Sequence, residues 1–246
     1  MASAWESVGI DDSDMRLYLS LPESGGPVPG IVVIHGQSGL EEFIQETTRM
    51  LAHQGYAAVA PDLFHRDGPN CKDDGPTRRA RLRDATIIKD VNAAIRRLKN
   101  HKQVDGARLG IVGFCMGGRV VYLAAAASPD LKAGVMYYGG NTMTAMGDGP
   151  SPFERTREIH CPIQGHFGED DGNPSPADMR KLDAELTRWG KVHEFHSYAG
   201  AAHAFANTGS ASYRPDAAAA SWPRTFDFFR RNSLAPEEKS AAAARP

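Results

Sequence analysis

The chain has 246 residues, of which 41% are hydrophobic, and a formal net charge of −2 at pH 7. This length suits one α/β domain whose core is large enough to fold without disulfides. The near-neutral charge offers no basic face, so we expect no nucleic-acid partner. Three widely spaced cysteines, an odd number, favour a reducing, cytoplasmic location. Neither a signal peptide nor a membrane-spanning apolar run is apparent, so we expect no membrane contact.

Short apolar runs alternate with longer helical patterns, which predicts a mostly parallel central sheet flanked by helices. We expect a single domain over residues 1–234 and a disordered tail over the Ala-rich, charged residues 235–246. The Gly- and Pro-rich stretch between the strands at 133–138 and 162–167 is short, so little or no lid is expected. In chain order the predicted elements are strands at 7–10, 15–21 and 31–34, a helix at 41–54, a strand at 57–60, a helix at 77–99, a strand at 109–112, a helix at 119–127, strands at 133–138 and 162–167, a helix at 176–189, a strand at 192–198 and a helix at 218–232.

The most informative motif is Gly-Phe-Cys-Met-Gly-Gly at 113–118, directly between a β-branched apolar run and a helical stretch. This is the Gly-x-nucleophile-x-Gly elbow, which raises a side chain above a sheet on a strained strand-to-helix turn. Glycines two residues before and after Cys115 leave room for that tight turn. A buried structural cysteine is the alternative for any single Cys. The strand, both glycines and the immediate helix favour a nucleophile at Cys115.

An elbow nucleophile requires an acid and then a histidine later in the chain. Asp171 follows the strand before the last, at the carboxyl edge where the sites of open α/β sheets form. Its neighbours Glu169 and Asp170 are alternatives for the acid. His203 lies among small residues in the loop after the last strand. We therefore predict Cys115, Asp171 and His203 as a catalytic triad.

The roles of these residues follow from their chemistry. A thiolate is the attacking species, and an adjacent imidazolium lowers the pKa of a cysteine. Asp171 would accept the second ring N–H of His203 and fix the tautomer of the imidazole. The tetrahedral oxyanion needs two backbone donors, for which we predict the N–H groups of Met116 and Gln37.

Metal and cofactor chemistry is not indicated. His160, Cys161 and His166 match no standard zinc spacing. Nothing in the chain matches a phosphate-binding loop followed by Lys-Ser or Lys-Thr. We expect no metal and no cofactor.

These motifs resemble the dienelactone hydrolases, also called carboxymethylenebutenolidases. The resemblance spans about residues 31–229 and implies an α/β-hydrolase fold and cofactor-free hydrolysis of small esters or lactones through a thioester acyl-enzyme. It is carried by the Cys elbow, by the order Cys115, Asp171, His203, by Tyr-Ala-Gly-Ala-Ala-His-Ala-Phe at 198–205, and by Gly-Tyr-Ala-Ala-Val-Ala-Pro-Asp-Leu-Phe at 55–64.

The sequence departs from this family at two positions. Family members commonly carry a Glu that engages the thiol before substrate binds, and Gly36 stands at the matching position. Glu41 and Glu42 are candidates to restore that carboxylate, although the first turn of a helix also suits them as solvated residues. An Arg that grips the substrate carboxylate is replaced by Asn207.

A basic cluster on the helix predicted at 77–99 offers another anion site. Arg78, Arg79 and Arg81 are all candidates, and the sequence does not choose between them. A solvated helix face is the alternative interpretation of the cluster. We take Arg81, together with Asn207, as the predicted substrate-binding residues.

The sequence therefore predicts a cysteine-dependent hydrolase whose partner is a small-molecule ester or lactone. One alternative is a catalytically silent family member that acts as a binding protein. The Gly at position 36 favours this alternative and the complete triad opposes it. A second alternative is a promiscuous hydrolase of activated phosphotriesters, which an open site without a lid would permit.

Overall fold

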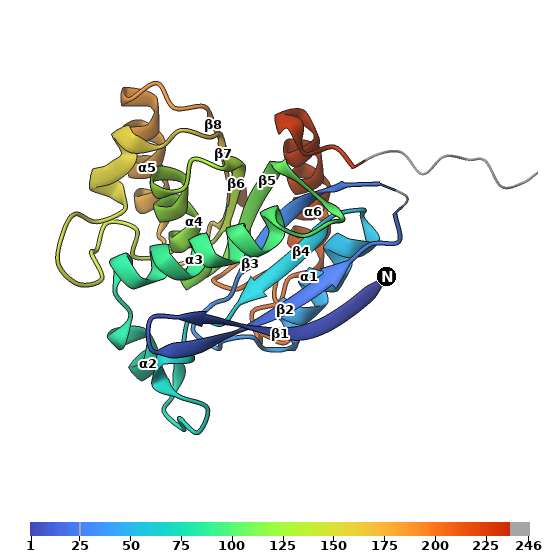
Figure 1. Cartoon of the computed structure of the whole chain (residues 1–246). Coiled ribbons are helices and arrows are strands. Elements are labelled where there is room, and N and C mark those ends of the chain that lie inside the picture. Colours follow the sequence, from blue (N-terminus) through green and yellow to red (C-terminus); the bar gives the residue numbers. More distant parts are fainter. Residues whose placement is uncertain (25, 237–246) are drawn as a thin grey trace, which may run out of the picture.

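Eight strands form one sheet in the order β1-β2-β4-β3-β5-β6-β7-β8 in the computed structural model, which describes residues 1–24 and 26–236 (Figure 1). β1 and β2 form an antiparallel hairpin, β2 pairs antiparallel with β4, and the remaining neighbours are parallel. The strands are β1 (Ala2–Ile10), β2 (Ser13–Leu21), β3 (Val28–Ile34), β4 (Ala57–Pro61), β5 (Val104–Phe114), β6 (Leu131–Tyr137), β7 (Ile163–Gly168) and β8 (His193–Tyr198). The fold is the predicted α/β-hydrolase fold.

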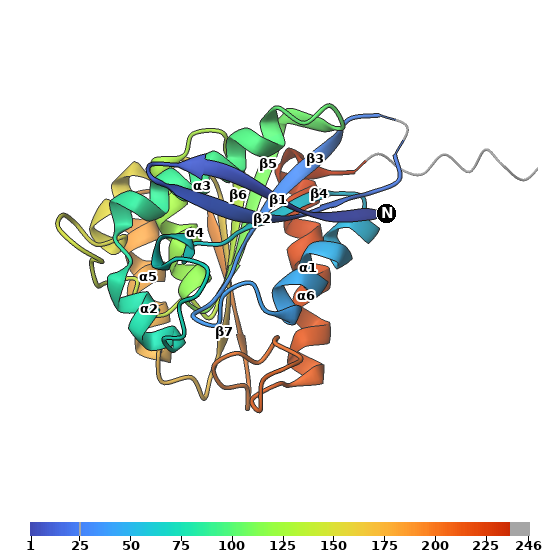
Figure 2. The ribbon, with the colours of Figure 1, turned by 60° about the horizontal axis from the view of Figure 1, so that its bottom comes forward.

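Helices cover both faces of the sheet. α3, α4 and α5 pack on one face, and α1 and α6 pack on the other (Figure 2). The helices are α1 (Glu42–His53), α2 (Gly75–Arg81), α3 (Asp84–Lys99), α4 (Met116–Ala127), α5 (Pro176–Arg188) and α6 (Pro215–Phe229), with short turns η1 (His65–Asp67), η2 (Phe153–Glu158) and η3 (Arg230–Leu234). No helix in the described part of the chain is both long and apolar enough to span a membrane.

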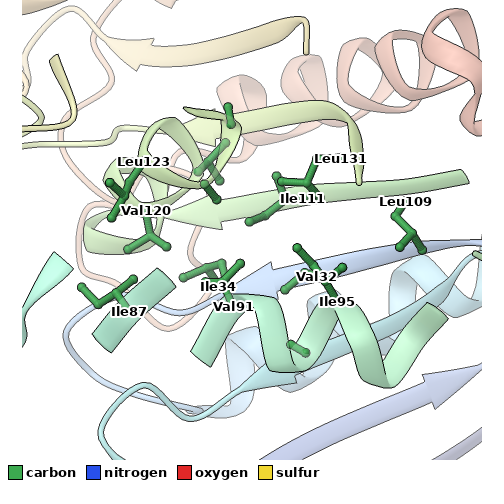
Figure 3. Close-up of a cluster of buried hydrophobic side chains, with 14 of the residues drawn as sticks. Val32, Ile34, Ile87, Val91, Ile95, Leu109, Ile111, Val120, Leu123 and Leu131 are labelled. Carbon is green, nitrogen blue, oxygen red and sulfur yellow. The ribbon is translucent and has the colours of Figure 1, made fainter. Parts of the chain in front are cut away.

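Alternation along β3 shows why the sheet is buried on both faces. Val32 and Ile34 pack with the helices α3 and α4, where Ile87 and Val120 lie (Figure 3). The intervening residues of the strand belong to the second core cluster, on the side of α1 and α6. Because successive side chains point to opposite faces, a strand that is apolar throughout requires cover on both sides.

The helix predicted at 77–99 is wrong as a single element. The chain breaks after α2, and Leu82 and Arg83 take extended backbone angles before α3 begins. The break lets the N–H of Asp84 donate to the carbonyl of Met146 at 2.7 Å instead of to a helical carbonyl. The three candidate arginines, Arg78, Arg79 and Arg81, therefore belong to α2 and not to α3.

Within the described residues, the connection from β6 to β7 contains one short turn, η2. This agrees with the expectation of little or no lid. Of the predicted tail, residues 237–246 lie outside the described residues. The carboxyl ends of the parallel strands thus meet at an edge that is covered by loops.

Candidate active site

The predicted elbow is present at the carboxyl end of β5. Cys115 has φ 58° and ψ −120°, a conformation that L residues rarely adopt, and α4 begins at the next residue. The N–H of Cys115 donates to the carbonyl of Tyr137 at 3.0 Å, which fixes the turn against β6. A Cβ at Gly117 would lie 2.2 Å from the carbonyl oxygen of Ile34. Glycine is therefore required there by the close approach of β3.

The structure brings Asp171 and His203 together. Nδ1 of His203 lies 2.9 Å from Oδ2 of Asp171, whose side chain is 2% exposed. The N–H of Asn173 donates to the other carboxylate oxygen at 2.8 Å. The alternative acids are exposed, and Glu169 instead accepts from Ser197. Asp171 is therefore the carboxylate that orients the imidazole.

Cys115 completes the group from the other side of the imidazole. Burial alone raises the pKa of its thiol, but the hydrogen bond and charge of His203, together with two backbone N–H groups, hold that pKa below its usual value. Burial also disfavours the imidazolium, yet hydrogen bonds to Asp171 and Cys115 raise the pKa of His203 to about 10. These opposite shifts favour a thiolate–imidazolium pair in the resting protein.

Two backbone N–H groups also approach the sulfur of Cys115. They belong to Met116 and Gln37, the predicted oxyanion donors, and both help to lower the pKa of the thiol.

The loop that carries Gln37 is shaped by a residue that the sequence analysis missed. His35 is fully buried, which lowers its pKa; its Nε2 accepts from the N–H of Leu63 at 3.0 Å. Its Nδ1–H can then donate to the carbonyl of Gly36 at 2.6 Å.

The two departures from the family pattern, Gly36 and Asn207, have different neighbours. A Cβ at Gly36 would lie 3.2 Å from Cβ and 3.8 Å from Sγ of Cys115, so even a methyl group there would contact the nucleophile. Nδ2 of Asn207 donates to Oε1 of the half-buried Glu41 at 3.1 Å. Burial raises the pKa of Glu41 despite this hydrogen bond. Glu42 is exposed and pairs with Arg49 instead.

Tyr138 packs against the imidazole of His203. Its ring meets the ring of His203 edge-on, with the centroids 5.2 Å apart. The hydroxyl is buried and has no hydrogen-bond partner among the described residues. Burial, and then the nearby negative charges of Cys115 and Glu41, raise its pKa well above the ordinary value for tyrosine. The phenol therefore stays neutral beside the site.

A pocket of about 390 Å³ opens at these residues. Its single arginine is Arg79, whose side chain makes no hydrogen bond or ion pair within the described chain. Arg81, the arginine predicted to bind substrate, does not line this pocket and instead binds Asp67 and Asp73. Asn207 does not line the pocket either. The lining consists of Gln37, Arg79, Cys115, Met116, Gly140, Asn141, Asp171, Gly172, Asn173 and His203.

The third basic candidate is also occupied elsewhere. Nε of Arg78 lies 3.0 Å from Oδ2 of Asp67, and its guanidinium lies over the ring of Phe64. Arg78 binds Asp67, and Arg81 binds Asp67 and Asp73. Arg79, between them on α2, lines the pocket instead.

The described residues contain no group of three His, Cys, Asp or Glu side chains suited to a metal ion. Nε2 of His160 lies 2.8 Å from the carbonyl of Ser128. Cys161 is buried, which raises the pKa of its thiol to about 12. His166 contacts Tyr198 through Nδ1 at 2.8 Å. These three positions thus have separate structural partners.

Known proteins share this fold and sequence pattern. Residues 15–233 match the model of the dienelactone hydrolase family. A putative carboxymethylenebutenolidase of Methylorubrum extorquens is 33% identical and covers 93% of this chain and 80% of its own. The crystal structure of a putative dienelactone hydrolase from Klebsiella pneumoniae has a TM-score of 0.86 at 30% identity, covering 94% of this chain and 98% of its own.

A more distant neighbour is a dienelactone hydrolase-like promiscuous phosphotriesterase from metagenomic libraries. It has a TM-score of 0.81 at 23% identity and covers 94% of this chain and 98% of its own, a likeness that concerns the fold. The family match spans nearly the whole sheet and every residue of the pocket. The chain therefore belongs to the dienelactone hydrolase family, whose hydrolases act on ester and lactone bonds.

Proposed function

We propose that this chain hydrolyses small esters and lactones through a thioester formed on Cys115. One observation carries the proposal: a single sulfur atom meets the imidazole of His203 and the backbone N–H groups of Met116 and Gln37. An activated nucleophile, its acid–base partner and two oxyanion donors are thus gathered at one point, which is what acyl transfer requires.

Acylation begins when the thiolate of Cys115 attacks the carbonyl carbon of the ester. The C–S bond forms as the carbonyl oxygen takes up negative charge, and the N–H groups of Met116 and Gln37 donate to that oxygen. The C–O bond to the alcohol then breaks, and His203 gives its Nε2 proton to the leaving oxygen. Asp171 holds the Nδ1–H throughout. In a lactone, the released hydroxyl stays attached to the acyl chain.

Deacylation reverses the roles. The neutral imidazole of His203 takes a proton from water as the water oxygen attacks the thioester carbon. The second tetrahedral intermediate collapses, the C–S bond breaks, and Cys115 leaves as a thiolate while the carboxylic acid departs. The thiolate–imidazolium pair is thereby restored. Its dependence on a reduced thiol suits a cytoplasmic location, which we also infer.

The pocket determines the size and charge of the substrate. A volume of about 390 Å³ admits a small ester or lactone. The unpaired guanidinium of Arg79 adds a site for a carboxylate or another anionic group beside the scissile bond. Substrates that carry one negative charge close to the ester therefore fit the pocket best.

The test is turnover of a panel of short p-nitrophenyl esters and lactones, combined with rapid quenching and intact-mass analysis. We expect release of nitrophenol and an acyl adduct that maps to Cys115 and is labile to hydroxylamine. Turnover without any adduct on Cys115, or an adduct elsewhere, would refute the thioester.

The same samples separate the two alternative functions. A silent binding protein would give neither turnover nor adduct. A phosphotriesterase would turn over paraoxon faster than any carboxylic ester and would acquire a diethylphosphoryl group. Either result would replace the proposal.

A further inference from the structure

The helix α2 borders the catalytic pocket, to which it contributes Arg79. None of its residues is buried, so packing into the core does not hold it in place. Ion pairs do so instead, because Arg78 and Arg81 lie 3.0 and 3.1 Å from the largely buried carboxylate of Asp67. The guanidinium of Arg78 also lies over the ring of Phe64. The position of α2 beside the pocket therefore depends largely on Asp67.

The first residue of α2 touches the loop that carries an oxyanion donor. A Cβ added to Gly75 would lie 2.4 Å from the carbonyl oxygen of Gln37 and 3.0 Å from its carbonyl carbon. The first distance is shorter than a Cβ atom tolerates, so the two backbones pack directly against each other only because residue 75 is glycine. The N–H of this same Gln37 approaches the sulfur of Cys115. The start of α2 therefore packs on the residue that is predicted to donate to the oxyanion.

Few other contacts fix Gln37 on this side. Its carbonyl accepts no hydrogen bond from any of the described residues. Within the loop, the N–H of Gly39 donates to the carbonyl of Gly36 at 3.2 Å, a bond that closes the turn without engaging the carbonyl of Gln37. A peptide group without a hydrogen bond takes its position from the atoms packed against it. Contact with Gly75 therefore limits where Gln37 can place its N–H.

We propose that Gly75 is a positioning residue that holds the N–H of Gln37 in place to donate to the oxyanion, and that the ion pairs of Asp67 keep α2 against the loop. The inference rests on the function proposed above and concerns the geometry of the same site. It makes α2 a common support for two groups. Arg79 would bind an anionic group of the substrate, and Gly75 fixes the donor for the charge that develops on the carbonyl oxygen.

Gly75→Ala tests the contact in the full-length protein. The new methyl group must push either α2 or the loop away, so kcat/KM for p-nitrophenyl acetate should fall by about 10- to 100-fold, compared with about 10²- to 10³-fold for a deleted oxyanion donor. Gly9→Ala is the matched control, since a Cβ there would lie 3.9 Å from its nearest neighbour, Asp14, in ordinary contact. It should keep the wild-type kcat/KM. Circular dichroism should show that both variants are folded.

A thionoester separates the oxyanion site from other effects. In p-nitrophenyl thionoacetate the carbonyl oxygen is replaced by sulfur, a weak hydrogen-bond acceptor, so the oxyanion donors contribute less to its turnover. The ratio of oxoester to thionoester kcat/KM should therefore fall by about fivefold or more in Gly75→Ala and stay unchanged in Gly9→Ala. Iodoacetamide labelling of Cys115, at a pH where the thiol is fully ionised, needs no oxyanion and should be equally fast in both variants.

Asp67→Asn tests the support of α2 from the other side. It removes the charge from both ion pairs and keeps the size of the side chain. It should lower the oxoester to thionoester ratio in the same direction as Gly75→Ala, although by less. The double variant should be no slower than Gly75→Ala alone, because a loosened α2 can withdraw from the methyl group and both changes act on one contact.

Three outcomes would overturn the inference while turnover by the wild type leaves the proposed function standing. They are an unchanged ratio in Asp67→Asn, multiplied effects in the double variant, and an unchanged ratio in Gly75→Ala. The last would count even if kcat/KM fell, because Gly75 would then act on something other than the oxyanion donor. Absence of turnover in the wild type would refute the proposed function and this inference with it.

Discussion

Cys115 and Cys161 lie at opposite edges of one sheet, and the pKa values of their thiols are shifted in opposite directions. Cys161 precedes β7 at the amino edge and packs into the core, where burial raises the pKa of its thiol to about 12. Cys115 follows β5 at the carboxyl edge and also contacts the core. Burial opposes ionisation there too, yet the pKa of Cys115 falls.

The difference comes from what the chain places beside each sulfur. At the carboxyl edge the imidazole of His203 and two backbone N–H groups point at Cys115. At Cys161, within the described residues, its own backbone and the charge of Lys132 lower the pKa of the thiol, and burial outweighs them. Burial by itself therefore makes a thiol inert, and directed donors turn the same burial into a reactive site.

Removing each sulfur in turn gives the largest expected difference. Cys115→Ala should lower kcat for a p-nitrophenyl ester by about 10⁴-fold or more, because the residue that forms the covalent bond is gone. Cys161→Ala should retain kcat and lose only a little thermal stability, since a buried Cys acts as a small hydrophobic residue. Steady-state kinetics and circular dichroism make the measurement. Turnover by Cys115→Ala near the wild-type rate would contradict the assignment.

Alkylation kinetics sharpen the comparison further. In a Cys71→Ser background, the rate of iodoacetamide modification of Cys115 should rise with pH through a midpoint below 9, because the pKa of the thiol is lowered. In His203→Ala only burial and the N–H groups remain, so the midpoint should move upwards and labelling at pH 7 should slow. His193→Ala, which removes the contacts of another histidine ring with Lys191, Asp183 and Phe195, is the control. Identical midpoints in the wild type and His203→Ala would rule out the ion pair.

The charge around Cys115 is open to a third test. Arg79 lines the pocket, so the anionic reagent iodoacetate should gain on neutral iodoacetamide at Cys115. Arg79→Met should lower that preference, and the preference for carboxylate-bearing over neutral esters, by about tenfold, as expected for one charge-assisted hydrogen bond. Arg81→Met should leave both ratios unchanged, because Arg81 pairs with Asp67 and Asp73. Equal effects of the two substitutions would remove Arg79 from the site.

The smallest effect is expected at Glu41. Glu41→Gln keeps an oxygen that accepts from Asn207, so the pH midpoint of Cys115 alkylation should stay where it is. Glu42→Gln should behave in the same way because Glu42 is exposed and pairs with Arg49. The measurement is the same labelling profile. A downward shift of the midpoint in Glu41→Gln alone would show that this carboxylate takes the place of the missing Glu.

Local sequence patterns predicted the elbow and the alternation of strands and helices along the chain. The turn at Cys115 is specified by glycines within two residues of it, and the strands by runs of β-branched residues. The pairing of Asp171 with His203 could be anticipated from the order of residues and the edge at which parallel strands end. These features depend on short-range geometry.

The features that could not be predicted depend on contacts distant in the chain. The sequence around Arg79 and Arg81 does not distinguish them, because it does not reveal that Asp67 and Asp73 bind Arg81. The break between α2 and α3 follows from Asp84, which meets Arg119 thirty-five residues away. A periodic pattern carries no information on such partners.

Gly36 lies directly beside the nucleophile, so one substitution there would alter the environment of the Cys115 thiol. Its backbone lies outside the left-handed region, and a Cβ there would lie 3.2 Å from Cβ of Cys115, so an alanine requires a shift of a few tenths of an ångström at Cys115. That Cβ would also lie 3.8 Å from the sulfur of Cys115. Residue 36 is therefore a position at which a single substitution changes the immediate surroundings of Cys115 while the rest of the active site stays the same.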